Sequence, residues 1–246
     1  PKWKRNVIAL HFSASTIFGY GGKVAPPFSR IFMGGENDVR GFDFYSITPV
    51  AYIPSSAGAT ILNPDGTPRV QKNLINGVLT PTTVTQQVPI YQIITPGGDT
   101  QGIFNAEYRI PIFGPVTLAP FFDAGLNKIA WANQLKVNAG QIASLNSQFP
   151  QAAFSDRVQI APGTQAMRMS TGIEVQVVLP IVQAPFRVYW AYNPVVLRQF
   201  LQPPIALDRS MFPNQTTFVN TINQFSPAYP DYEQRSVFRF TIGRTF

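Results

Sequence analysis

The sequence of 246 residues lacks cysteine altogether, and His11 is its single histidine. These absences exclude disulfides, thiol nucleophiles, thiolate metal sites and multi-histidine metal centres. Charged residues make up only 13% of the chain, about half of the roughly 25% in an ordinary soluble domain. No apolar run approaches the roughly 20 residues of a membrane-spanning helix. Strands therefore remain as the way to hide the apolar side chains, and we expect no cofactor.

The net charge of +7 comes from 19 basic and 12 acidic residues. Such a balance can indicate nucleic-acid binding, but the basic residues are scattered singly and never form a run. We therefore expect no nucleic-acid partner. The first residue is Pro1 and no signal-peptide core follows it, so the sequence is expected to be an internal or C-terminal piece of a longer chain.

The clearest regularity in the sequence is an alternation of apolar and polar residues. For example, Phe104, Ala106 and Tyr108 alternate with Asn105, Glu107 and Arg109. A period of two predicts a strand with one apolar and one polar face. Six segments show it, at about residues 5–20, 101–111, 115–127, 167–179, 186–194 and 235–246.

The connections between these segments alternate strictly between short and long. Prolines bound the short ones, Pro111 to Pro115 and Pro180 to Pro185, whereas the long ones cover about 21–100, 127–166 and 194–234. Outer-membrane barrels have tight turns on one side, long extracellular loops on the other, and strands of about 10 residues. We therefore predict an all-β fold, a transmembrane antiparallel β-barrel whose apolar face meets lipid. A soluble β-sandwich explains the alternation but neither the loop lengths nor the shortage of charge.

A specific motif lies in the first long loop, where Gly34-Gly35 precedes Val39-Arg40-Gly41-Phe42. The stretch 27–42 resembles the sixth extracellular loop of the BamA-type outer-membrane insertase and transporter superfamily. Further similar stretches follow in order, at 105–109, 121–125, 167–173 and 240–246. The resemblance covers nearly the whole chain. It implies that residues 1–246 form the last six strands of a barrel of about 16 strands, and that the loop at about 21–100 folds inward.

The residues of this motif also suggest a contact on their own. Arg40 lies between Gly35 and Gly41, which allow a tight tip, and a guanidinium withdrawn from water needs a carboxylate partner. Glu107 and Asp123 lie on the polar faces of adjacent predicted strands. We expect Arg40 to contact Asp123, with Glu107 nearby, and to act as a latch, since arginine can bond carboxylates bidentately. Alternatively, all three are ordinary lumen charges in water.

The last predicted strand carries a second pattern. Phe238, Phe240, Ile242 and Phe246 alternate in a way that resembles the β-signal by which outer-membrane barrels are recognised. In the family, the position of Gly243 is where the last strand can bend away from the first and open a seam toward lipid. The alternative is a plain terminal strand, which every barrel has.

Less specific signals lie in the loops. Residues 133–148 are expected to contain a short helix, and residues 55–96 an elongated external loop without evident chemistry. Asn214-Gln215-Thr216 fits a glycosylation sequon that we expect to be unused.

The resemblance implies a non-enzymatic function in the bacterial outer membrane: assembly of nascent β-barrel proteins. Lipoprotein partners would bind periplasmic POTRA domains that precede this region, and the lipid bilayer would surround it. The alternatives are a TamA-type or two-partner secretion transporter of the same superfamily and a passive porin. An outer-membrane hydrolase that uses His11 with Ser13 or Ser15 is the enzyme alternative, but no acidic residue lies close to them in the sequence.

Overall fold

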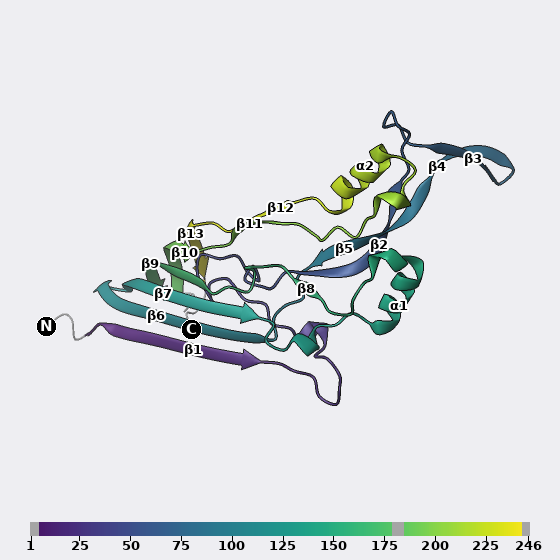
Figure 1. The fold of residues 1–246 in the computed structure, drawn as a ribbon. Coiled ribbons are helices and arrows are strands. Elements are labelled where there is room, and N and C mark those ends of the chain that lie inside the picture. Colours follow the sequence, from purple (N-terminus) through teal and green to yellow (C-terminus); the bar gives the residue numbers. More distant parts are fainter. Residues whose placement is uncertain (1–4, 179–184, 243–246) are drawn as a thin grey trace.

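The computed structural model describes residues 5–178 and 185–242. Its main feature is a six-stranded antiparallel sheet with the order β1-β6-β7-β9-β10-β13 (Figure 1). These six strands follow each other in the sheet in the order in which they occur in the sequence, and the remaining strands lie in the connections between them. The strands are β1 (Val7–Thr16), β6 (Thr100–Phe113), β7 (Val116–Lys128), β9 (Arg168–Val178), β10 (Pro185–Val195) and β13 (Ser236–Ile242). One strand falls in each of the six predicted segments.

The strand ends differ from the prediction mainly at β1. This strand ends at Thr16 instead of about residue 20, because the chain turns through Gly21 and Gly22, both of which have positive φ. For the last strand, the predicted residues 243–246 lie outside the described ones. The sheet of the described residues is open, with β1 and β13 at its edges.

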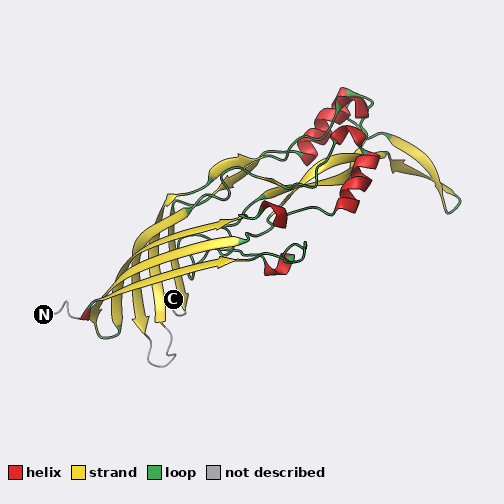
Figure 2. Ribbon diagram, turned by 60° about the horizontal axis from the view of Figure 1, so that its bottom comes forward, coloured by secondary structure: helices red, strands yellow, loops and turns green. Residues whose placement is uncertain are grey.

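The sheet is curved, and the other elements are gathered at the end opposite the N and C termini (Figure 2). Its two faces have an unusual distribution of side chains. On one face, which we call the apolar face, Phe12 is 73% and Phe238 70% exposed, whereas Glu107 and Asp123 on the opposite, polar face are 2% and 0% exposed. This is the reverse of a soluble sheet, and it suits a surface that meets lipid.

The long connections contain much regular structure of their own. A second sheet has the order β5-β2-β8, a hairpin consists of β3 and β4, and β11 pairs with β12. These strands are β2 (Ala51–Thr60), β3 (Val70–Ile75), β4 (Val78–Thr83), β5 (Thr85–Ile94), β8 (Gln159–Ile160), β11 (Arg198–Leu201) and β12 (Tyr229–Tyr232). Short 3-10 helices cover Pro27–Ser29, Ala132–Gln134, Pro150–Ala152 and Arg209–Met211.

The elongated loop expected at residues 55–96 thus contains paired strands that the sequence analysis did not predict. β2 and β5 pair along ten residues, from Ala51 opposite Ile94 to Thr60 opposite Thr85. The physical reason is that this tract is also rich in Val, Ile, Tyr and Thr, which favour strands. Val88 on β5 is fully buried against Ala59, Leu207 and Phe212, so the external part has a core of its own.

Two α-helices lie in the later loops. α1 (Ala139–Gln148) falls within the predicted helical stretch. Asn138 is its N-cap, and the Asn138 side chain accepts hydrogen bonds from the backbone N–H groups of Gly140 and Gln141. α2 (Gln215–Phe225) was not predicted. Asn214 caps it by accepting from the Thr217 N–H and also donates to the Leu62 carbonyl, so the sequon's amide is engaged in the fold.

No helix among the described residues is long and apolar enough to cross a membrane.

Candidate functional site

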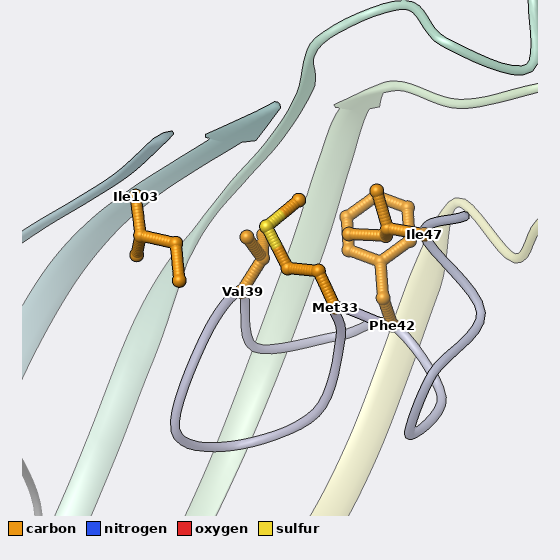
Figure 3. Packing of buried hydrophobic residues seen from close by; sticks show 5 residues of the cluster. All are labelled: Met33, Val39, Phe42, Ile47 and Ile103. Atoms are coloured by element: carbon orange, nitrogen blue, oxygen red, sulfur yellow. The ribbon is translucent and has the colours of Figure 1, made fainter. Parts of the chain in front are cut away.

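Residues 31–47, here called the docked loop, lie against the polar face of the six-stranded sheet. Backbone pairing of Met33 with Ile47 and of Gly35 with Val39 closes the loop into a compact tip. Its apolar side chains pack with Ile103 of β6 in one buried cluster, which consists of Met33, Val39, Phe42, Ile47 and Ile103 (Figure 3). The docked loop thus places a buried apolar cluster on a face that also carries the buried charged residues of the sheet.

Two glycines make this close approach possible. Gly41 has φ +83°, and a Cβ on it would lie 2.5 Å from Oδ1 of Asn193 on β10. A Cβ on Gly125 of β7 would lie 2.5 Å from Cγ2 of Val39. Since real Cβ atoms essentially never come so close, a larger residue at either position requires the neighbouring atoms to shift.

The side chain of Arg40 extends from the tip and binds the carboxylate of Asp123 through two hydrogen bonds. Nε donates to Oδ2 over 2.7 Å and Nη2 to Oδ1 over 2.8 Å, and the backbone N–H of Arg40 adds a third bond to Oδ2 at 3.0 Å. Arg40 is 1% exposed. This is the bidentate fork-to-carboxylate geometry that lysine cannot form.

Two further carboxylates and one ring complete the surroundings of Arg40. Nη1 donates to Glu107 on β6 at 2.6 Å and to Glu174 on β9 at 3.2 Å. The Arg40 Cζ lies 3.8 Å from the ring centroid of Phe121 on β7, within cation–π range. Phe121 stands directly opposite Glu107 in the sheet register, so a single guanidinium reaches three strands.

Other arginines balance the buried acids. Arg109 donates to Glu107 at 2.7 Å, and Arg187 on β10 donates to both oxygens of Glu174 at 2.6 and 2.8 Å. Three arginines thus face three carboxylates, and the network is formally neutral, which a buried charge cluster requires. Burial lowers the pKa of Arg40, but the bonds to Asp123 and the charges of Glu107 and Glu174 outweigh it and hold the pKa above its ordinary value.

Side-chain amides of the sheet hold the loop backbone. Asn127 Nδ2 donates to the carbonyls of Ile31 and Ile47 at 2.9 and 3.0 Å, and Asn193 Nδ2 donates to the Gly41 carbonyl at 2.9 Å. Asn105 Nδ2 donates to the Asp38 carbonyl at 2.7 Å. These bonds help to satisfy the backbone carbonyls of the docked loop.

The structure brings together all the predicted loop and wall residues. Val39, Arg40, Gly41 and Phe42 lie on the tip, and Glu107 and Asp123 lie beneath Arg40. Their function as a latch stays a prediction. The sequence reasoning missed Glu174, Arg187 and the amides of Asn127 and Asn193. Glu174 and Arg187 stand at polar positions of their alternating segments, but the pattern alone does not say which polar positions meet the loop.

The predicted residues of the last strand lie apart from this network. Phe238, Phe240 and Ile242 project from the apolar face and are 70%, 71% and 65% exposed. Gly243 and Phe246 lie outside the described residues. Elsewhere, His11 Nδ1 lies 2.9 Å from Oδ1 of Asn105, and within residues 5–178 and 185–242 no cluster of acidic, His or Cys residues could hold a metal ion.

In a comparison with protein families, residues 2–246 match the model of the Omp85 superfamily domain. The chain belongs to the Omp85 superfamily. Omp85 proteins are outer-membrane β-barrels concerned with protein insertion or transport, and this explains the exposed apolar face of the sheet. Searches of curated proteins and of solved structures gave no match.

Proposed function

We propose that this Omp85 chain is the C-terminal part of the barrel of a BamA-type assembly factor, which folds nascent β-barrel proteins into the outer membrane. The observation that carries the proposal is the Val39-Arg40-Gly41-Phe42 tip, which lies on the polar face with its arginine on three carboxylates. We further propose that the activity is non-enzymatic and needs no cofactor.

The sheet suits this activity because its edges carry strand-forming residues. β13 pairs with β10 on one side, and opening of the full barrel along its other side would present backbone donors and acceptors. An incoming strand can pair with such an edge, while alternate side chains set its register. Nascent β-barrel proteins would be the substrates, and the exposed apolar side chains of β13 would face lipid during this pairing. Assembly lipoproteins would bind outside the described region.

The docked loop argues against a passive porin. It covers part of the polar face with an apolar cluster whose five side chains are buried. A wide aqueous channel needs that face to be open to water. We therefore expect small, fluctuating conductance from the reconstituted protein.

The test is reconstitution of the full-length protein in phospholipid vesicles, followed by measurement of how fast an unfolded outer-membrane barrel protein becomes protease-resistant. We expect faster folding than in empty vesicles. We also expect that Arg40→Lys removes most of the gain, because lysine cannot bond Asp123 bidentately. The matched control Arg157→Lys changes an exposed arginine and should keep the activity.

Two results would contradict the proposal. One is that the protein folds no barrel substrate but moves a secreted polypeptide across the vesicle membrane, as a two-partner secretion transporter would. The other is a large, stable single-channel conductance without any folding activity, which would indicate a porin.

A further inference from the structure

The docked loop also contacts the last strand of the sheet, through one side chain that the Arg40 network does not use. Arg239 stands on the polar face of β13. Its Nη2 donates to Oδ1 of Asp43, its Nη1 donates to the Phe42 carbonyl at 3.2 Å, and the same nitrogen lies 3.9 Å from Oε1 of Glu36. A single arginine therefore bonds both a carboxylate and the backbone of the loop, directly beside the tip.

β13 has few other attachments among the described residues. It lies at the sheet edge and pairs only with β10, from Phe186 opposite Ile242 to Tyr192 opposite Ser236. Its outward side chains Phe238 and Phe240 are about 70% exposed and contribute little packing within the chain. Beside the β10 ladder, Arg239 thus adds a bonded contact between β13 and the docked loop.

The contact of Arg239 differs from that of Arg40 in its access to water. The Arg239 side chain is 24% and that of Asp43 78% exposed, whereas the side chains of Arg40 and Asp123 are 1% and 0% exposed. A cavity of about 200 Å³ borders the pair and is lined by Asp43, Arg239 and Glu233, among others. Because water can replace the lost bonds, we expect the Arg239 contact to be the weaker of the two.

We propose that Arg239 is a positioning residue that ties the terminal strand to the docked loop, so that release of β13 and undocking of the loop are coupled. While Arg40 keeps the tip on the wall, Asp43 and the Phe42 carbonyl stay where Arg239 can reach them. When the tip leaves, β13 loses this attachment to the docked loop. As a step in substrate insertion the coupling rests on the proposed function, but the contact itself does not depend on any substrate.

Amide hydrogen exchange of the full-length protein in phospholipid vesicles, read by mass spectrometry, tests this coupling without a substrate. Failure here would leave the proposed function standing. We expect that Arg239→Gln raises exchange over residues 236–242 about two- to fivefold, the effect of a partly exposed ion pair, and leaves the β6–β7 ladder unchanged. Arg239→Lys should restore part of the protection. The control is Arg235→Gln, which removes the same charge at an exposed position four residues earlier and should change nothing.

A double variant distinguishes coupling from a local effect. Arg40→Lys alone should also raise exchange of β13, and adding Arg239→Gln should raise it no further, because both changes remove the same attachment. Additive effects would overturn the proposal. So would exchange in Arg239→Gln equal to that in Arg235→Gln, or a uniform rise over all strands.

Discussion

At the scale of single residues, docking of the loop depends on how a charged group is stabilised away from water. Arg40 is nearly fully buried and still charged, because three carboxylates and an aromatic ring surround it. Removing one partner of such a buried network leaves uncompensated charge, which usually costs more than the pair contributes. The loop residue and the wall residues therefore depend on each other.

Replacing Arg40 should lower stability more than replacing any exposed arginine. We expect Arg40→Ala to lower the free energy of unfolding by about 3–5 kcal/mol, because the buried Asp123 loses its arginine and Glu107 keeps only Arg109. Urea unfolding in vesicles, followed by the heat-dependent shift of the folded band on gels, measures this. Arg157→Ala, at an exposed site, is the control, and an equal loss in both variants would argue against a latch.

Gly41 offers a separate test of the tight approach. Gly41→Ala introduces a Cβ at φ +83° and 2.5 Å from Asn193, whereas Gly66→Ala introduces one at φ +87° with nothing within 4 Å. The second variant carries only the backbone penalty, about 1–2 kcal/mol. We expect Gly41→Ala to lose clearly more in the same unfolding measurement. Similar losses would mean that the loop does not pack against β10.

At the scale of elements, the alternating pattern predicted the six sheet strands, because each has one face toward lipid and one toward the loop. The pattern was less informative outside the sheet. Asn76-Gly77 between two strand-like runs is a strong hairpin signal, and the positive φ of both residues shows the turn between β3 and β4. Similarly, Asn214 marks the start of α2. Both signals were local and were present in the sequence.

The site could be predicted only in part for a different reason. The Arg40–Asp123 contact joins residues 83 positions apart, and the motif made that pairing a plausible expectation. Glu174 and Asn193 meet the loop only because the order of β9 and β10 in the curved sheet places them beneath it. The alternation of apolar and polar residues predicts on which face of the sheet a side chain lies, but not whether its position along the strand is next to the docked loop.

Docking of the loop as an element should depend on its apolar cluster. Phe42 is 3% exposed and packs with Met33 and Ile47. Phe42→Ala should destabilise docking by about 3–5 kcal/mol and make residues 31–47 accessible to protease added to intact vesicles. Phe28→Ala removes the same side chain at a site that is 89% exposed and should leave the cleavage pattern unchanged; new cleavage in both variants would contradict the packing.

At the scale of the whole molecule, we expect exposed apolar side chains of the six-stranded sheet to face lipid and those of the β3–β4 hairpin to face water. Phe12 on β1 is 73% and Leu74 on the β3–β4 hairpin 70% exposed. Because the chain has no cysteine, Phe12→Cys and Leu74→Cys can each carry one fluorescent label. We expect lipid-attached quenchers to quench the label at position 12 and aqueous iodide to quench the one at position 74. Iodide quenching at both would contradict a membrane-facing sheet.

The central claim is that the loop carrying Arg40 lies on the inner wall in the assembled protein. The most direct measurement is disulfide formation in the full-length protein in its membrane, in the double variant Val39→Cys with Gly125→Cys. A Cβ at position 125 would lie 2.5 Å from Cγ2 of Val39, which places the two side chains within reach of a disulfide. The control is Val39→Cys with Gly102→Cys, because a Cβ at 102 would meet nothing within 4 Å. We expect near-complete cross-linking of the first pair under mild oxidation and almost none of the second. Equal, low yields in both would show that the loop is not docked.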